Sequence, residues 1–244
     1  MIEIIKKQEQ AYGEFNGGEI IENKPIGFPQ EGGKTQPYSN IFYWAHAKAV
    51  KESTIGLHPH KGFEIISFVL SGTIKHYDTL LKKWIRLKEG DVQVIKSGSG
   101  ISHSEALNDN SSIFQIWFDP DLNKSLNKPA QYQDYTKDSF KVINSKKELI
   151  GENSIQIDSE GVKVYEIELD NEDIKIEVKE KKTYSLYIMY GEISINKQNL
   201  EQDDFAIIKE EKELWFNTNE KAKIFCVETN TKLTYSSYYE TYIK

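Results

Sequence analysis

Short stretches of alternating or continuously apolar residues, separated by turns that often contain glycine, dominate the first half of the chain. The clearest of them occupy residues 41–47, 63–70, 73–78, 84–87, 92–95 and 111–118. Alternation puts successive side chains on opposite faces of a strand, and short apolar runs are typical of strands buried on both faces. Such strands, with turns at roughly eight- to twelve-residue spacing, predict an all-β sandwich or barrel and argue against alternating strands and helices.

The second half of the chain repeats this pattern. Its predicted strands lie within residues 162–169, 174–178, 184–195, 203–208 and 222–227. The predicted hairpin at residues 67–74 resembles the one at 186–193. Each is followed by an acidic turn and an apolar strand, at 89–92 in the first half and 202–205 in the second. We interpret this weak internal repeat as two similar β-barrels in tandem.

The alternating pattern breaks between the two halves. Residues 119–139 are polar and rich in turn-forming residues, which is typical of a linker. We therefore predict a first barrel over residues 1–122, a linker over 123–139 and a second barrel over 140–244. The tyrosine-rich stretch 233–242 is predicted to be a terminal strand that packs on the body of the protein or on a partner.

Composition and charge exclude several classes of protein. The 244 residues are 38% hydrophobic and 12% aromatic, which indicates a globular protein. The net charge is −7 and Arg86 is the only arginine, so the sequence gives no sign of direct binding to nucleic acid. No apolar run is long enough to span a membrane, and the N-terminus lacks the order of a signal peptide. The single cysteine, Cys226, fits a buried structural role in a reducing compartment, and we expect a cytoplasmic protein.

Three of the five histidines lie at two glycine-flanked edges of the predicted strands. His58 and His60 are two residues apart, and so are His103 and Glu105. Residues two apart in a strand share a face, so two such pairs could enclose one metal ion. We expect His46 to be a packing or surface residue, because it has no partner at a matching spacing. The second half has no histidine, so only one such site is predicted.

Three imidazoles and one carboxylate suit a divalent transition metal: Fe(II), Mn(II), Co(II), Ni(II), Cu(II) or Zn(II). Ions that prefer oxygen ligands alone, such as Ca²⁺ and Mg²⁺, are disfavoured. Four protein ligands leave one or two positions open on an ion that takes five or six. Such a site permits substrate coordination and redox chemistry, whereas a closed four-ligand zinc site would be structural.

The motifs around these residues resemble those of the pirin family of the cupin superfamily. They are His-Pro-His-Lys-Gly-Phe-Glu at 58–64, Gly-Asp-Val-Gln at 90–93 and Gly-Ser-Gly-Ile-Ser-His-Ser-Glu at 98–105. The resemblance spans about residues 40–135, and it departs from the family where Lys61 replaces the common arginine. It implies a bicupin, two tandem jelly-roll-like barrels, with one metal ion, normally iron, in the N-terminal barrel. Matched residue by residue, it makes the metal ligands His58, His60, His103 and Glu105.

Three further residues have roles that the sequence leaves open. Glu64 stands where many cupins have a metal-binding glutamate. The pirin pattern gives that role to Glu105 and leaves Glu64 as a residue that supports the ligands without binding the metal. If one strand runs unbroken from His58, spacing puts Glu64 on the same face, so spacing alone does not decide. His76 and Asp78 also match family positions, and we expect them to be supporting or surface residues.

The resemblance implies two functions of different kinds. Several pirins are similar in activity to quercetin 2,3-dioxygenases, which open a flavonol ring with O₂ and release carbon monoxide. The substrates would then be O₂ and a small aromatic or enolic molecule, and Glu105 could accept the proton of the substrate hydroxyl. The alternative is an iron-dependent regulatory module, similar to a transcriptional co-regulator, that binds protein partners without turnover. A different metal-dependent reaction on the same scaffold is also open, because fold does not fix function.

Overall fold

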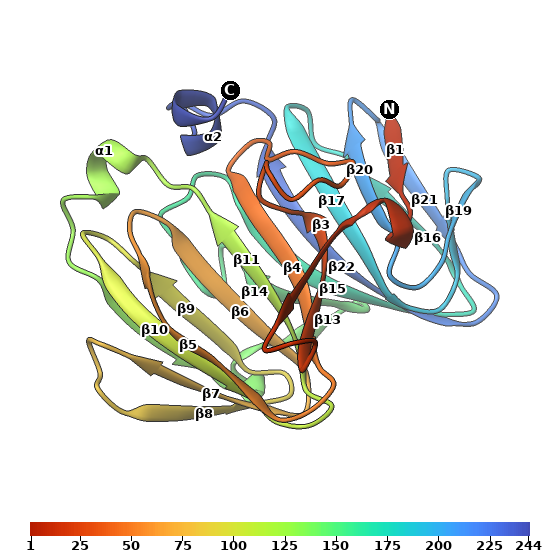
Figure 1. The fold of residues 1–244 in the computed structure, drawn as a ribbon. Helices are drawn as coiled ribbons and strands as arrows, with labels where there is room; N and C mark the ends of the chain where they lie inside the picture. The colour runs from red at the N-terminus through yellow and green to blue at the C-terminus, as the bar shows by residue number, and fades with distance from the viewer. The chain divides into compact units, whose positions relative to one another are not determined.

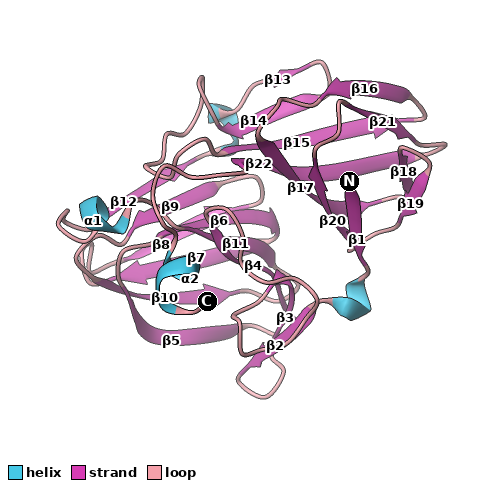
Figure 2. Ribbon diagram, turned by 90° about the horizontal axis from the view of Figure 1, so that it is seen from above, coloured by secondary structure: helices cyan, strands magenta, loops and turns pink.

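The computed structural model describes residues 1–244, which form twenty-two β-strands, two α-helices and two 3₁₀ helices. Figure 2 shows that strands make up nearly all of the regular structure. The strands form four sheets, and all pairings between named strands are antiparallel. The all-β prediction is confirmed. No helix is long or apolar enough to cross a membrane.

The chain divides into two compact units, each built from one seven-stranded and one four-stranded sheet. We call the unit formed by residues Gln10–Ser139 and Thr234–Lys244 the first barrel. We call the unit formed by residues Met1–Glu9 and Phe140–Leu233 the second barrel.

The first barrel carries the two histidine-containing motifs. Its seven-stranded sheet has the order β12 (Gln131–Tyr135), β9 (Val92–Lys96), β6 (Glu64–Ser71), β11 (Ser112–Phe118), β4 (Ile41–Ala49), β3 (Ile20–Ile26) and β2 (Ala11–Phe15). Its four-stranded sheet has the order β5 (Ser53–His60), β10 (Ile101–Leu107), β7 (Thr73–Asp78) and β8 (Trp84–Lys88). The remaining elements are α1 (Leu122–Ser125), α2 (Tyr238–Tyr242) and the 3₁₀ helix η2 (Lys137–Ser139).

The second barrel repeats this plan (Figure 1). Its seven-stranded sheet has the order β1 (Ile2–Ile5), β20 (Phe205–Lys209), β17 (Lys182–Tyr190), β22 (Lys221–Asn230), β15 (Lys163–Asp170), β14 (Lys146–Ile150) and β13 (Val142–Ile143). Its four-stranded sheet has the order β16 (Asp173–Glu177), β21 (Glu213–Asn217), β18 (Ile193–Ile195) and β19 (Gln198–Leu200). A 3₁₀ helix, η1 (Lys7–Glu9), follows β1.

The two interiors are filled differently. The second barrel holds one continuous cluster of buried, almost entirely apolar residues, including Leu186, Ile188, Phe216 and Ile224. The buried cysteine, Cys226, is part of this cluster and is unpaired. The first barrel holds two smaller clusters, one around Ile20, Val69, Leu107 and Ile113 and one around Phe42, Phe63, Ile65 and Ile95. Buried histidines and carboxylates lie in the same barrel, which therefore has a more polar interior.

The N-terminal strand belongs to the second barrel. The sequence instead predicts that it lies in the first barrel, with that barrel beginning at residue 1. Strand β1 pairs with β20, with Ile4 opposite Ala206, and the side chain of Ile5 is fully buried. In Figure 1 the red strand β1 lies beside the blue strand β20. A four-residue apolar strand carries no local signal of its partner, so its sequence could not assign it to either half.

The predicted linker at 123–139 also belongs to the first barrel. It contains β12, which adds to the edge of the seven-stranded sheet by pairing with β9. Helix α1 packs close to the backbone at Gly62, where an added Cβ would lie 2.8 Å from Leu122. Strand β12 is an exposed edge strand with polar outward side chains, and this is why its sequence resembles a linker.

The tyrosine-rich tail forms helix α2 of the first barrel and not the terminal strand that the sequence predicts. The Ser237 side chain accepts a hydrogen bond from the Glu240 backbone, and the Glu240 carboxylate accepts one from the Ser237 backbone, so the two form a capping box. The Tyr238 ring lies 5.3 Å, centroid to centroid, from the rings of both Phe42 and Phe63. The tail therefore packs on the body of the first barrel, as expected.

Asp119 fixes the tail by two kinds of contact. Its carbonyl oxygen accepts a hydrogen bond of 2.7 Å from the Tyr235 hydroxyl, and its carboxylate accepts one from the backbone N–H of Tyr238. Burial raises the pKa of the Asp119 carboxyl to about 7, and the nearby Glu240 carboxylate adds to this effect, although the Tyr238 N–H opposes it. The attachment of the tail thus includes a buried acid that keeps its proton more readily than usual.

We predict that Tyr238→Ala lowers the stability of the first barrel by about 2 kcal/mol, because it removes a partly buried ring from an aromatic cluster. The measurement is the midpoint of chemical unfolding. The matched control is Tyr12→Ala in the same barrel, since that ring is 58% exposed. Equal midpoints for the two variants would show that the tail contributes no packing energy.

We also predict that Asp119→Asn removes a pH dependence of stability. Well below about pH 4 the carboxyl is protonated in both the folded and the unfolded state, so it adds no pH dependence to the free energy of unfolding. As the pH rises from about 4 to 7 the unfolded state ionises while the folded state keeps its proton, so the free energy of unfolding of the native protein falls. Melting temperatures at pH 5 and pH 7.5 should show the Asn variant gaining stability relative to the native protein as the pH rises. Parallel profiles would contradict this, and the exposed Asp138 provides the control, Asp138→Asn.

Candidate metal centre

Pairing of β5 with β10 brings the two histidine motifs together. His103 is the Cα partner of His58, and Ile101 is the partner of His60. His58 and His60 are two residues apart in β5, so their side chains lie on one face. Strand β5 is at the edge of its sheet, which is where the intervening proline, Pro59, is tolerated.

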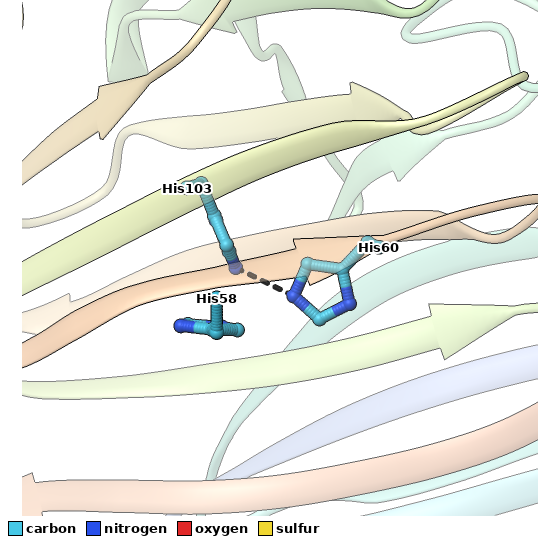
Figure 3. A group of neighbouring side chains, drawn as sticks. All are labelled: His58, His60 and His103. Carbon is cyan, nitrogen blue, oxygen red and sulfur yellow. Dashed lines mark hydrogen bonds between the residues drawn. The ribbon is translucent and has the colours of Figure 1, made fainter.

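The three imidazole rings converge on one point (Figure 3). One ligand atom from each of His58, His60 and His103 lies within 4.8 Å of the other two. His60 Nε2 and His103 Nε2 are 2.9 Å apart. Two nitrogens bound at about 2.05 Å to one ion, at a right angle, would be separated by about 2.9 Å. The three side chains therefore fit a transition-metal ion.

Two of the three histidines, His60 and His103, have the protonation state that metal binding requires. Burial lowers the pKa of His60 to about 3 and that of His103 to about 2, and the neighbouring imidazoles act in the same direction. Both rings are therefore neutral at pH 7. His58 Nδ1 lies 2.7 Å from the carbonyl oxygen of Gly56, to which it can donate its proton. That bond leaves Nε2 of His58 with a lone pair for an ion.

Glu105 is buried close by but is not part of the three-histidine cluster. A bulge between His103 and Glu105 places Glu105 opposite Ile55 of β5. Both of its carboxylate oxygens accept hydrogen bonds from Nε2 of Gln115, at 2.8 and 2.9 Å. The role of Glu105 as a fourth ligand therefore stays a prediction.

Glu64 lies on a different sheet from the histidines. It begins β6 of the seven-stranded sheet, and its Oε1 is 3.6 Å from Nζ of Lys96. Gly62, with a φ of 86°, turns the chain between His60 and Glu64. Strand β5 ends at His60 and β6 begins at Glu64, so no single strand joins the two residues. The alternation of side chains along one strand therefore does not place Glu64 on the face of the histidines.

His76 and Asp78 form a buried pair beside the three histidines. The sequence left open whether they are supporting or surface residues, and the surface alternative is wrong. His76 Nε2 is 2.7 Å from Asp78 Oδ2, and the His76 ring centroid is 5.6 Å from that of His103. The Tyr132 ring stacks on His76 at 4.6 Å. Nδ1 of His76, Nδ1 of His103 and the Tyr132 hydroxyl are buried without hydrogen-bond partners.

A cavity of about 340 Å³ opens beside the histidines, between the two sheets of the first barrel. Its polar lining residues are Glu22, His58, His60, Glu105 and Gln115, and its aromatic ones are Phe15, Phe28, Tyr43 and Trp117. Aliphatic side chains, among them Ile55, Leu107 and Ile113, complete the wall. A mainly apolar cavity with a few converging polar groups is typical of a site for a small molecule.

Sequence reasoning missed the residues that orient this site. Gln115 and Trp117 are two residues apart in β11, and Trp117 Nε1 donates a hydrogen bond of 3.1 Å to Gln115 Oε1. The Trp117 ring lies 4.7 Å from the His60 ring, nearly perpendicular to it. The spacing in β11 shows that both side chains share a face, but only the packing of the two sheets shows which face meets the histidines.

Comparison with known proteins gives the class of this fold and its family. Residues 29–118 match the Pirin family model, and residues 142–229 match the model described as the quercetinase C-terminal cupin domain. The fold is also that of YhhW from Escherichia coli, with a TM-score of 0.83 and 19% identity over 95% of this chain and 99% of that one. The protein is thus a bicupin with two tandem cupin barrels. It belongs to the pirin family, which confirms the family predicted from the motifs.

Curated relatives match part of this chain. A pirin-like protein of Caulobacter vibrioides is 48% identical over 65 residues, which are 26% of this chain and 28% of that protein. Quercetin 2,3-dioxygenase of Escherichia coli is 38% identical over 71 residues, 28% of this chain and 30% of that protein. The chain thus aligns with about a third of the length of these relatives. YhhW has also been solved in complex with nickel(II), and that structure matches this chain with a TM-score of 0.80 at 19% identity.

We predict that His103→Ala abolishes stoichiometric metal binding and leaves the β-sheet content nearly intact, since it removes one of three converging ligands and no backbone pairing. Elemental analysis of the purified protein measures the first effect and circular dichroism the second. The control is His46→Ala, a buried histidine on β4 whose ring contacts Phe114 and which lies outside the cluster. Full metal content in the His103 variant would show that the ion binds elsewhere.

Proposed function

We propose that the first barrel is a metal-dependent dioxygenase of the quercetin 2,3-dioxygenase type, which cleaves a flavonol or a related enol with O₂. The observation that carries this proposal is the cluster of three converging imidazoles, two of which line a mainly apolar cavity that also exposes a buried carboxylate. The names of the curated relatives support the same reaction class.

His58, His60 and His103 hold the ion in this proposal, and Glu105 supplies a fourth ligand. A divalent ion bound there lowers the pKa of a coordinated hydroxyl and adds a site at which O₂ can react. Fe(II) is the ion that the family resemblance favours. Nickel, manganese, cobalt, copper and zinc suit the same donor set, and the nickel(II) complex of YhhW is consistent with this breadth.

Glu105 accepts the proton of the substrate hydroxyl. Two hydrogen bonds from Gln115 hold its carboxylate in place. Ser67 Oγ contributes a weaker contact at 3.4 Å to Oε1. Gln115 is itself held by Trp117, so the base is oriented by a chain of side chains that comes from the opposite sheet.

The aromatic wall binds the ring system of the substrate and keeps water out. The Phe28 ring stacks on Tyr43 at 4.6 Å and meets Trp117 edge-on at 5.3 Å. Rings fixed in this way offer flat apolar surface to a planar aromatic ligand.

The alternative role as a regulatory module that binds protein partners stays a prediction from the sequence, and so does the cytoplasmic location. The contacts described for the first barrel concern the metal centre and its cavity, and they do not test either prediction.

We predict that the metal-loaded protein binds quercetin under nitrogen and turns it over in air, and that Glu105→Gln lowers kcat by about 10²–10⁴-fold because it removes the base. The measurements are oxygen uptake, release of carbon monoxide and loss of flavonol absorbance. Because Glu105 is also the proposed fourth ligand, rates are compared per bound metal ion. His46→Ala serves as the control and should keep the native rate.

Binding of quercetin without turnover in air would refute the proposed reaction and leave a binding module. Native turnover in the Glu105 variant at equal metal content would refute the role of Glu105 alone.

A further inference from the structure

A second polar group, apart from the histidines, faces the same cavity. Glu22 lies on β3 and is 5% exposed, and Lys24, two residues on, is 4% exposed. Oε2 of Glu22 is 3.2 Å from Nζ of Lys24, which in turn is 2.6 Å from Oε1 of Glu31. Two carboxyl groups therefore share one ammonium group. Of these three residues, Glu22 lines the cavity.

The Glu22 carboxylate keeps capacity to accept a hydrogen bond. Its Oε1 accepts one of 3.1 Å from the Tyr43 hydroxyl. Its Oε2 is buried and has the ion pair with Lys24 but no hydrogen-bond partner. Burial raises the pKa of Glu22, although Lys24 and Tyr43 act against that rise. A buried carboxyl oxygen with a free lone pair is thus held at a cavity wall.

The neighbouring strand leaves room for this group. Gly13 of β2 is the Cα partner of Glu22. A Cβ at Gly13 would lie 2.5 Å from Nζ of Lys24 and 3.0 Å from Oε2 of Glu22, so any other residue would displace the ion pair. The absence of a side chain at this position is therefore part of the local structure that allows the buried charges.

Glu22 and the histidines line the cavity from opposite sheets. Strand β3 belongs to the seven-stranded sheet, whereas β5 and β10 belong to the four-stranded one. Packed sheets lie about 10 Å apart, so a ligand held at the histidines can extend toward Glu22. An apolar group placed there would leave a desolvated carboxylate oxygen unpaired, whereas a hydroxyl would donate a charge-assisted hydrogen bond to it.

We propose that Glu22 determines the specificity of the cavity, which selects aromatic enols that carry a second hydroxyl group remote from the one that binds at the histidines. The second hydroxyl donates a hydrogen bond to the Glu22 carboxylate. The inference rests on the proposed function for the position of the first hydroxyl. Sites built to pair with a hydroxyl reject analogues that lack it far more strongly than apolar pockets separate ligands by size.

The test compares two ligands by calorimetry under nitrogen, with the metal-loaded protein. Quercetin carries several hydroxyls besides its enol, and 3-hydroxyflavone carries the enol hydroxyl alone. We expect the native protein to bind quercetin at least 10-fold more tightly. We expect this preference to fall below 3-fold in Glu22→Leu and to weaken in Glu22→Gln, which keeps the volume of the side chain and removes its charge. The Gln variant covers the case in which the Leu variant does not fold.

The matched control is Glu31→Gln, which removes the same charge from the same ion cluster but from a residue outside the cavity lining. It should keep the native preference within 3-fold. A native protein without preference, or a preference that survives in both Glu22 variants, would overturn the inference.

Turnover in air, measured on the same preparations, separates this inference from the proposed function. If neither flavonol is consumed while Glu22→Leu loses the preference in binding, the reaction is wrong and the role of Glu22 holds. If quercetin is consumed and both Glu22 variants keep the preference, the reaction holds and the role of Glu22 is wrong.

Discussion

The bulged register of β5 against β10 is the constraint on which the candidate centre depends. It sets His58 opposite His103 and, one bulge further on, Ile55 opposite Glu105. A slip of one residue would send the histidine side chains to the other face of the sheet, because the side-chain period of a strand is two. The cluster therefore follows from strand pairing, and its members need no flexible loop to meet.

The opposite sheet supplies the second half of the site. Glu105 comes from the four-stranded sheet, yet its carboxylate is held by Gln115 of the seven-stranded one. Trp117, from the same strand as Gln115, packs against His60. These contacts cross the space between the sheets, so the separation of the two sheets governs both the position of the base and the width of the cavity. A buried polar network of this kind is costly unless most of its members are satisfied, and the bidentate contact with Gln115 meets that requirement for Glu105.

The sequence predicted what depends on local spacing and missed what depends on tertiary partners. The two-residue periodicity was enough to place His58 and His60 on one face, and the strand pattern was enough for an all-β fold. The role of Glu64 depended on strand continuity, which the turn at Gly62 breaks. The N-terminal strand β1 and the tail helix α2 join the barrel of the other half of the chain, and neither sequence carries information about its partner. In the sequence, Gln115 is an ordinary residue of an alternating strand. Its contact with Glu105 becomes visible only when the packing of the two sheets is known.

The contrast between the two barrels shows what a metal-binding interior requires beyond its ligands. By their place in the sheet, β16 and β21 of the second barrel correspond to β5 and β10 of the first. There Ile174 is paired with Phe216 and Ile176 with Leu214, in a cluster of buried apolar side chains. Apolar side chains thus stand on the strands that correspond to those carrying the histidines of the first barrel.

Around its histidines the first barrel keeps buried pairs such as His76 with Asp78 and Glu22 with Lys24. Each of these groups is desolvated, and each is stable there only because a partner of opposite charge or a hydrogen-bond donor lies within reach. Replacing apolar residues of the second barrel by histidines would thus leave buried imidazoles without this surrounding network. The capacity to hold a reactive ion resides in the whole polar interior of the first barrel, of which the three histidines are the part that the sequence makes visible.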